Sequence, residues 1–311
     1  MRKLKPINQQ KMNMKIGIAG LGQMGNAIAK RLLQQGCSVT VFNRTAGPSE
    51  ALASIGAEVA KDLKSLAQSV DLVFTVVSDS ADVEEVILGN NGLLEGAHRN
   101  SLFVECSTID PDVSTRIGNV VRAAGFRMID APIGGRPAQA EHGQLIFMVG
   151  ALPEDLKYAC EILALLGSKI IHCGGPSMGI TMKVVNNLVS QSIQLLDLEA
   201  MALGMKAGLE PQIILDVLTS TAADNAPLHG RIPQSVLTGK YPTGFSAKLA
   251  HKDQGLAHNM ASRLGVPLFT LGQARQIYNI AISQGLGEGP SEIVAKVVEQ
   301  MTGVKLVFAD K

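Results

Sequence analysis

The stretch that decides the fold is GIAGLGQMGNAIAKRL, residues 17–32, near the start of the chain. It places glycines in a GxGxxG pattern directly after a short apolar run and before an amphipathic helical pattern. In such a strand-to-helix turn, backbone amides at the start of the helix can face a pyrophosphate. The sequence therefore predicts a dinucleotide site at this turn. The residues expected to contact the dinucleotide here are Gly20, Leu21, Gly22, Gln23, Met24 and Gly25.

The segment from Met14 to Gly174 alternates short β-branched runs with amphipathic stretches. The runs are KIGIA, SVTVF, DLVFTVV, SLFVE, FRMID, LIFMVG and KIIHCG. Such alternation is typical of an α/β fold in which helices wrap a mainly parallel sheet. We expect a Rossmann dinucleotide-binding domain over residues 14–175, preceded by a flexible tail over residues 1–13.

The strand signals stop after Pro176, and long helical patterns follow it. They cover residues 177–207, 210–220, 246–264, 270–284 and 290–301. We expect an all-α domain for substrate binding and oligomerisation over residues 176–311, joined by the long first helix, which should end at Gly208 as a C-cap. Apolar residues lie nearly all round this helix, so it should be buried by neighbouring helices or by a second subunit. The expected assembly is a homodimer or homotetramer.

The amino-acid composition excludes several classes of protein. The chain has 311 residues, 46% of them apolar, a formal net charge of +1 and no Trp, which argues against nucleic acid binding. Its four cysteines form no CxxC pair and its six histidines no HxxxH pair, so we expect no metal site. No apolar run reaches the length of a membrane span, and the first residues lack the apolar segment of a signal peptide. We therefore expect a cytoplasmic protein that binds no membrane.

The stretch TVFNRT, residues 40–45, indicates which dinucleotide is bound. The second strand of such a unit usually ends at an acid that bonds the ribose of NAD and repels a 2′-phosphate, but here Asn43 takes its place. Arg44 can offer a planar charged fork to that phosphate, and the Thr45 hydroxyl is a neighbouring donor. We predict NADP as the cofactor, with NAD possible; an exposed arginine on a turn is the alternative reading of Arg44.

Four motifs, GLGQMG, DAPIGGRPAQAEHG, GITMKVVNN and LAHKD, resemble in order and spacing those of the β-hydroxyacid dehydrogenases. That family includes 3-hydroxyisobutyrate dehydrogenase, tartronate semialdehyde reductase, glyoxylate/succinic semialdehyde reductase and sulfolactaldehyde reductase. The resemblance runs from about Met14 to Leu306. It implies a cleft between a Rossmann domain and a helical domain, where a hydride passes between the nicotinamide and a small anionic substrate.

The resemblance also implies roles for individual residues. The catalytic lysine of the family falls on Lys183 and its partner asparagine on Asn187, one helical turn later. An ammonium near the carbonyl oxygen can donate the proton that aldehyde reduction requires, the same lysine can act as the base in the reverse reaction, and the amide can orient the substrate. Both residues are also expected to bind substrate. The other matched positions are Val77, Ser78, Thr108, Phe245 and Lys252 for the cofactor and Asp253 for the substrate.

The substrate loop departs from the family pattern. Where most members have V-S-G-G after DAP, this chain has Ile133, Gly134, Gly135 and Arg136. Backbone amides in the loop can still bind an anion, and Arg136 can reach a carboxylate or a sulfonate, or point to solvent. The stretches GGPSMGITMKVVNN, STAA and LAHKDQGLA are closer to the sulfolactaldehyde reductases, although that branch usually keeps the ribose-binding acid.

The sequence thus predicts an NADPH-preferring oxidoreductase that interconverts a short anionic aldehyde and its 3-hydroxy acid. An NADH-dependent 3-sulfolactaldehyde reductase is the nearest alternative. A dinucleotide-binding protein without turnover is the alternative from another class, and the presence of both Lys183 and Asn187 argues against it. Imine reductases share the architecture but generally lack the lysine, which favours carbonyl chemistry.

Overall fold

The computed structural model describes residues 14–308 of the chain, so the predicted tail lies outside the described residues. The chain forms two compact units, of which the first ends at Lys183 and the second begins at Val184. This division falls inside the long helix, and the boundary that we placed at residues 175 and 176 stays a prediction.

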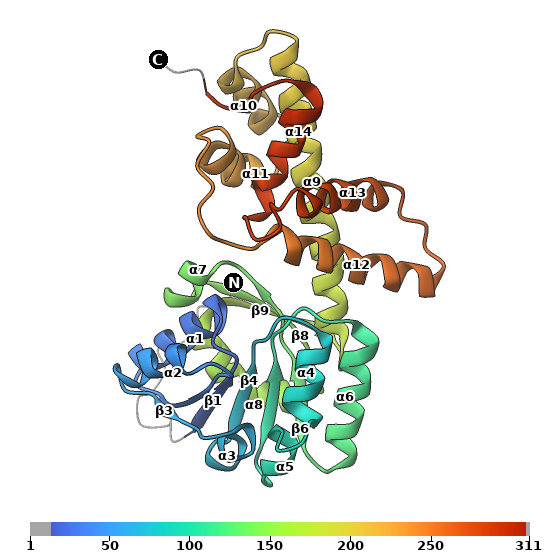
Figure 1. Cartoon of the computed structure of the whole chain (residues 1–311). Coiled ribbons are helices and arrows are strands. Elements are labelled where there is room, and N and C mark those ends of the chain that lie inside the picture. Colours follow the sequence, from blue (N-terminus) through green and yellow to red (C-terminus); the bar gives the residue numbers. More distant parts are fainter. Residues whose placement is uncertain (1–13, 309–311) are drawn as a thin grey trace. The chain divides into compact units, whose positions relative to one another are not determined.

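The N-terminal unit is built on a nine-stranded sheet (Figure 1). Its strands are β1 (Lys15–Ala19), β2 (Ser38–Phe42), β3 (Glu58–Val59), β4 (Leu72–Thr75), β5 (Leu102–Glu105), β6 (Arg127–Asp130), β7 (Ile133–Gly134), β8 (Leu145–Gly150) and β9 (Gly167–Gly174). The order is β3-β2-β1-β4-β5-β6-β8-β7, and β9 pairs with β8. Strands β1 to β6 pair in parallel, whereas β8 is antiparallel to β6 and β7. The predicted α/β fold with a mainly parallel sheet is confirmed.

Helices cover both faces of this sheet (Figure 1). They are α1 (Gln23–Gln34), α2 (Ala46–Ala53), α3 (Leu63–Ser69), α4 (Ser80–Leu88), α5 (Leu93–Gly96), α6 (Pro111–Ala123), α7 (Pro137–Glu141) and α8 (Pro153–Leu166). Successive side chains of a strand point to opposite faces, so one strand contributes residues to the core on each side of the sheet. In β5, Leu102 and Val104 pack in one core cluster and Phe103 packs in the other. The central strands of the sheet, such as β4 and β5, are therefore buried on both faces.

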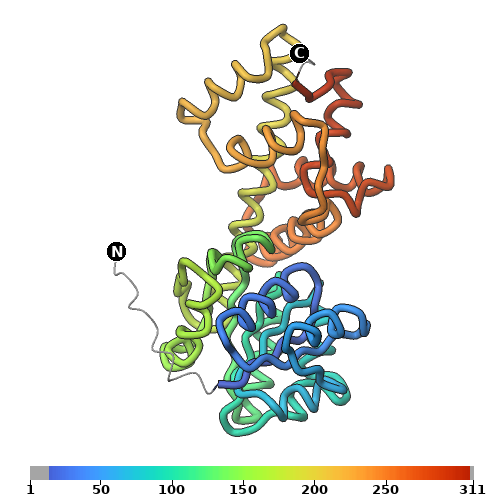
Figure 2. The backbone as a smooth tube through the Cα atoms, turned by 90° about the vertical axis from the view of Figure 1, so that its left-hand side faces the viewer, coloured from blue at the N-terminus to red at the C-terminus, as the bar shows by residue number. Residues whose placement is uncertain are grey.

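The C-terminal unit is all helical, as predicted. Helix α9 (Met178–Lys206) continues into it and is followed by α10 (Pro211–Ser220), α11 (Ala226–His229), the π-helix η2 (Ile232–Val236), α12 (Ala247–Leu264), α13 (Phe269–Ser283), the 3₁₀-helix η3 (Ser291–Val294) and α14 (Ala295–Thr302). Lys206 Nζ donates to the Thr302 carbonyl oxygen over 2.9 Å, so the ends of α9 and α14 lie together (Figure 2). Within residues 14–308, no helix is both long enough and apolar enough to span a membrane.

Helix α9 ends as the sequence predicts. Gly208 has a φ of 94°, a backbone conformation that glycine adopts without strain. The amide of Leu209 donates to the Gly204 carbonyl oxygen over 3.0 Å, which satisfies one of the last carbonyl groups of the helix.

The start of α9 is held by a buried carboxylate of the sheet. Asp130, at the end of β6, is 3% exposed; its Oδ1 accepts a hydrogen bond from the Ser177 amide over 2.6 Å and its Oδ2 from the Ile180 amide over 2.8 Å. A Cβ on Gly150 would lie 2.6 Å from the Asp130 carboxylate, and one on Gly179 would lie 2.3 Å from the Met148 carbonyl oxygen. The two glycines therefore let the first turn of α9 pack directly on the sheet.

We predict that Asp130→Asn lowers the free energy of unfolding by roughly 1–3 kcal/mol, because the amide NH₂ of asparagine faces a backbone N–H that then has no acceptor. Chemical denaturation measures the change. Asp71→Asn is the matched control, since Asp71 also accepts from a backbone amide, that of Lys15, but in an exposed position. An equal loss in both variants would contradict the anchoring role of Asp130.

Candidate active site

The glycine turn has the geometry of a backbone anion site. Gly20 has a φ of 97°, and a Cβ there would lie 2.3 Å from the Val76 carbonyl oxygen. A Cβ on Gly25 would lie 2.0 Å from the Gly20 carbonyl oxygen, so both glycines are required by close packing. A Cβ on Gly22 would meet nothing within 4 Å. Gly22 is the N-cap of α1, and as a glycine it has no side chain that could cap the helix. The N-terminus of α1 is thus open to an anionic ligand.

The other residues of the turn divide between the core and the surface. Leu21 is buried, Met24 packs partly against the core and Gln23 is exposed. The Leu21 amide donates to Asn43 Oδ1 over 2.9 Å, and Asn43 Nδ2 donates to Thr45 Oγ1 over 2.8 Å. Asn43 therefore ties the glycine turn to the end of β2. These two hydrogen bonds give Asn43 a structural role. A direct contact between Asn43 and the cofactor stays a prediction.

Arg44 and Thr45 lie at the start of α2. Arg44 is exposed, and its guanidinium has no hydrogen bond or ion pair with any residue in the described range 14–308. Thr45 is the N-cap of α2 but makes no side-chain cap bond, and the first turn of α2 contains no acidic residue. A free guanidinium beside an uncapped helix N-terminus favours a phosphate.

The ends of β4 and β5 lie next to the glycine turn. Val76 packs under Gly20, and the Val77 amide donates to Ser107 Oγ over 3.0 Å. Ser78 is exposed, and Thr108 is half-buried in the loop that follows β5. The predicted cofactor segments 77–78 and 108 are therefore brought to one edge of the sheet, where parallel strands end.

A buried carboxyl group beneath these segments was missed by the sequence reasoning. Glu105, the last residue of β5, is fully buried, and its Oε1 accepts hydrogen bonds from the Ser107 amide over 2.7 Å and from Thr75 Oγ1 over 3.3 Å. Burial raises the pKa of Glu105 to about 8, and burial likewise raises the pKa of its neighbour Asp130 to about 6. An acid at the end of the apolar run SLFVE is the signal that could have found it.

Lys183 lies in the second turn of α9 and contacts the predicted substrate loop. Its Nζ donates to the Ile133 carbonyl oxygen over 2.7 Å. In the same loop, Gly135 has a φ of 137°, and Arg136 is exposed. The Arg136 amide donates to Gln139 Oε1 over 2.8 Å, which fixes the entry into α7. The structure thus brings the predicted lysine and the predicted anion loop 133–136 together.

The predicted residues of the C-terminal unit form a second polar group. Asn187 Nδ2 donates to Asp253 Oδ2 over 2.6 Å, and Lys252 Nζ lies 3.3 Å from Asp253 Oδ1. Asn187 and Asp253 are buried, so the carboxylate holds the amide in one orientation. Phe245 is 37% exposed and immediately precedes Ser246, the N-cap of α12, the helix that carries the lysine and the aspartate.

Helix α9 presents further polar residues to the core of the C-terminal unit. Gln191 and Gln194 are buried beside Tyr278, whose hydroxyl donates to Gln191 Oε1 over 3.0 Å and accepts from Gln194 Nε2 over 3.2 Å. Arg231 Nη1 donates to Gln194 Oε1 over 2.8 Å. With Asn187, these glutamines form a polar stripe along one face of the helix.

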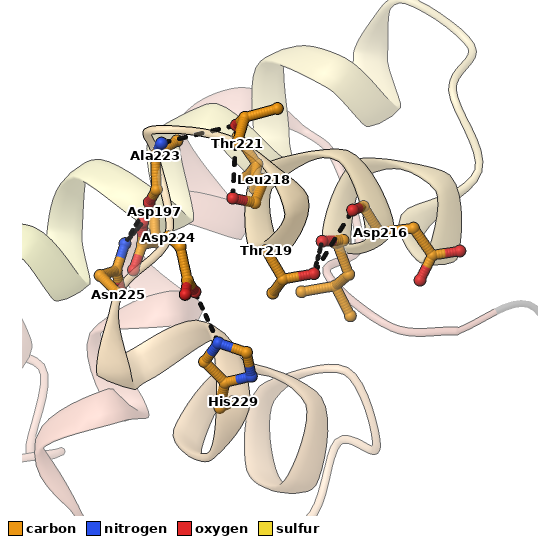
Figure 3. Close-up of polar contacts among 10 residues, drawn as sticks. Asp197, Asp216, Leu218, Thr219, Thr221, Ala223, Asp224, Asn225 and His229 are labelled. Carbon is orange, nitrogen blue, oxygen red and sulfur yellow. Dashed lines mark hydrogen bonds and ion pairs between the residues drawn. The ribbon is translucent and has the colours of Figure 1, made fainter.

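The segment that contains the STAA motif folds back on the same helix. Asn225 Nδ2 donates to Asp197 Oδ1 over 2.9 Å, and His229 Nε2 lies 2.5 Å from Asp224 Oδ1 (Figure 3). The Ala223 amide donates to Thr221 Oγ1 over 3.5 Å. Within the motif, the Thr221 side chain accepts this bond, and the residues that follow the motif make the other contacts in the connection between α10 and α11. Within the described part of the chain, no group of three or more His, Cys, Asp and Glu side chains is placed to hold a metal ion.

Comparisons with known proteins agree with this arrangement. A family model described as the NAD binding domain of 6-phosphogluconate dehydrogenase matches residues 15–175, and one described as NAD-binding of NADP-dependent 3-hydroxyisobutyrate dehydrogenase matches residues 177–298. The chain is 33% identical over 289 residues to the 3-sulfolactaldehyde reductase of Escherichia coli (strain K12), an alignment that covers 93% of this chain and 97% of that protein. It is 31% identical to the 2-(hydroxymethyl)glutarate dehydrogenase of Eubacterium barkeri, with 94% and 98% covered.

A solved structure gives the same result for the fold. The 3-hydroxyisobutyrate dehydrogenase of Mycobacterium tuberculosis, described with L-serine, superposes with a TM-score of 0.84 and 27% sequence identity. The match covers 92% of this chain and 99% of that structure.

The glycine turn offers a matched pair of variants. We predict that Gly25→Ala lowers the free energy of unfolding by roughly 1–3 kcal/mol, because its methyl group overlaps a backbone oxygen. Gly22→Ala should change stability by less than about 0.5 kcal/mol yet weaken NADPH binding tenfold or more, because its methyl group fills the space that the pyrophosphate approaches. Denaturant unfolding and fluorescence titration with NADPH measure the two effects. Unchanged NADPH affinity in Gly22→Ala would show that the pyrophosphate lies elsewhere.

Proposed function

Because the chain belongs to the β-hydroxyacid dehydrogenase family, and so is an NAD(P)-dependent oxidoreductase that acts on CH–OH groups, we propose its substrate class and its cofactor preference. The proposed reaction is the interconversion of a short aldehyde that bears a carboxylate or sulfonate and the corresponding 3-hydroxy acid, with NADPH preferred over NADH. The observation that supports the proposal is the 2.7 Å hydrogen bond from Lys183 Nζ to the Ile133 carbonyl oxygen, because it joins the proposed proton donor to the loop proposed to bind the anion.

Lys183 is the proposed general acid. Reduction of an aldehyde puts a hydride on the carbonyl carbon and a proton on the carbonyl oxygen, and bound NADPH supplies the hydride. The Lys183 ammonium can exchange its hydrogen bond to Ile133 for one to the substrate oxygen and then deliver the proton. In the oxidation direction, the neutral amine takes the proton from the hydroxyl group.

The loop 133–136 is the proposed anion site. Gly135 is exposed with a φ of 137°, and Arg136 carries an exposed guanidinium. The serine hydroxyl found in most of the family is absent here, so the charge of Arg136 takes over part of the binding to a carboxylate or sulfonate. In the C-terminal unit, Asn187 is the proposed substrate-orienting amide, held by Asp253.

Support for NADPH comes from the end of β2. Asn43 lacks the charge that would repel a 2′-phosphate, and its side chain is bonded to Leu21 and Thr45. Arg44 is exposed beside the uncapped N-terminus of α2. Both features favour a phosphate dianion over a bare ribose hydroxyl.

A 3-sulfolactaldehyde reductase is the second candidate, favoured by the 33% identity to that enzyme of Escherichia coli (strain K12). This candidate narrows the anionic group to a sulfonate, and it differs from the first in using NADH. A guanidinium can bind a carboxylate or a sulfonate, so Arg136 is compatible with both candidates.

For the assembly, we propose a homodimer or homotetramer. Helices α9 and α10 expose large apolar side chains, among them Leu196, Leu203, Ile213 and Val217. Leu203, Ile213 and Val217 line one apolar hollow, and such an exposed apolar patch is typical of a surface that another chain covers.

The function is tested by NADPH and NADH oxidation with succinic semialdehyde, methylmalonate semialdehyde, tartronate semialdehyde, glyoxylate and sulfolactaldehyde. One aldehyde should stand out in kcat/KM, and Lys183→Ala should lower its kcat by roughly 10²–10⁴-fold while the Kd for NADPH changes less than about threefold. Lys206→Ala, at the other end of α9, is the matched control and should keep full turnover. Loss of NADPH binding in Lys183→Ala would count against the lysine as general acid.

The cofactor preference has its own variant. Arg44→Ser should lower kcat/KM with NADPH by about 10–100-fold, which is about 1.4–2.8 kcal/mol, and leave kcat/KM with NADH almost unchanged. Arg99→Ser removes an exposed arginine from the loop before β5 and should affect neither cofactor. An equal loss with both cofactors would mean that Arg44 supports the turn and does not bind the 2′-phosphate.

A further inference from the structure

The reaction proposed above leaves one buried acid of the N-terminal unit without a role. Glu105 is 0% exposed at the end of β5, where parallel strands deliver the cofactor-binding segments. Buried carboxyl groups are costly unless they are hydrogen-bonded, so a fully buried one at this edge requires a physical reason.

The contacts of Glu105 join two strand ends. Its Oε1 accepts from Thr75 Oγ1 at the end of β4 and from the Ser107 amide after β5, over 3.3 and 2.7 Å. Ser107 Oγ in turn accepts from the Val77 amide over 3.0 Å. Because Val76 packs against Gly20, this series of contacts runs from the carboxyl group to the dinucleotide turn.

The two oxygens of Glu105 are used unequally. Oε1 takes both hydrogen bonds, as the carbonyl oxygen of a protonated acid can, whereas Oε2 is buried with no hydrogen-bond partner among residues 14–308. Among the described residues, the titratable groups that interact electrostatically with Glu105 are the Asp130 carboxyl group on β6 and the Cys106 thiol, and neither supplies a positive charge. Burial, with the nearby Asp130 charge adding to it, raises the pKa of Glu105 to about 8.

We propose that Glu105 is a positioning residue for the dinucleotide: as a neutral carboxylic acid, it holds the strand-end segments 75–77 and 105–107 in the arrangement that receives the cofactor. The proposal rests on the cofactor contacts proposed for residues 77–78. It makes cofactor binding sensitive to one proton inside the sheet, at a group that touches neither cofactor nor substrate.

The sign of the pH dependence follows from linkage. The pKa of Glu105 is raised in the folded protein, so its contribution to stability is complete below the ordinary glutamate range and is lost as the pH rises through about 8. The dinucleotide is itself anionic and disfavours a second negative charge behind its binding segments. Binding should therefore weaken as Glu105 ionises, and above pH 8 binding should be accompanied by proton uptake.

The test measures the Kd for NADPH between pH 7 and 9.5 by titration calorimetry, in two buffers of different protonation enthalpy that report proton uptake. The variants are Glu105→Gln, which keeps a neutral acceptor of the same shape, and Glu105→Ala, which removes it. Glu161→Gln on α8 is the control, because it removes an exposed glutamate from the same unit. Denaturant unfolding at each pH accompanies every titration.

We expect wild type and Glu161→Gln to lose at least fivefold in affinity across this range, with proton uptake above pH 8. Glu105→Gln should stay within threefold of the wild-type affinity at pH 7 and show neither the loss nor the uptake. Glu105→Ala should bind at least tenfold more weakly at every pH. If Glu105→Ala does not fold, the comparison of Glu105→Gln with wild type decides the question alone.

Three outcomes would overturn the proposal. They are a Glu105→Gln variant with the wild-type pH profile, a Glu105→Gln variant as weak at pH 7 as Glu105→Ala, and a folded Glu105→Ala variant with wild-type affinity. Because these measurements use binding alone, they stand apart from the aldehyde assays. A wild-type protein that binds NADPH with the expected pH profile but reduces no aldehyde would refute the proposed function and leave the role of Glu105 supported.

Discussion

The hydrogen bonds from the first turn of α9 to Asp130 are the contact on which the proposed chemistry depends. Asp130 ends a central strand, and it accepts from the amides of Ser177 and Ile180 at the point where the helix begins. A carboxylate at a helix N-terminus accepts hydrogen bonds from the free N–H groups there, and its negative charge interacts favourably with the positive end of the helix dipole. Because Lys183 follows within one turn of Ile180, the position and rotation of the helix start determine where the ammonium lies. The hydrogen bond to Ile133 then completes the placement.

The same sheet edge shows how burial alone does not decide the state of an acid. Glu105 and Asp130 are register partners on β5 and β6, and both are almost fully inaccessible. Both oxygens of Asp130 accept backbone amides, which favours the ionised form, whereas Glu105 Oε2 accepts no hydrogen bond from any residue between 14 and 308. Burial is the main cause that raises the pKa of both groups, to about 6 for Asp130 and about 8 for Glu105, and the accepted hydrogen bonds offset part of the rise in each.

The sequence predicts what depends on local pattern and leaves out what depends on three-dimensional neighbours. Runs such as KIGIA and SVTVF coincide with β1 and β2, because their residues alternate between two buried faces. The two-residue strands β3 and β7 are too short to give a period, and the prolines of α11 and η2 interrupt the helical pattern. Lys183 and Ile133 are fifty residues apart; the family motifs assign both to the substrate site, but the hydrogen bond between them was not predicted. The run SLFVE marks Glu105 as an acid at the end of a strand, but its hydrogen bonds to Thr75 and Ser107 and its burial depend on the folded neighbours.

The polar stripe on α9 has a consequence for how the C-terminal unit tolerates change. An apolar helix face can slide or rotate against its neighbours and find nearly equivalent packing, but Gln191, Gln194 and Tyr278 accept only one alignment of donors and acceptors. The stripe thus fixes the rotation of α9 about its own axis near Asn187. Replacing it by well-packed leucines could preserve or even increase stability while removing that constraint, so selection for activity and selection for stability would act on these glutamines in opposite directions.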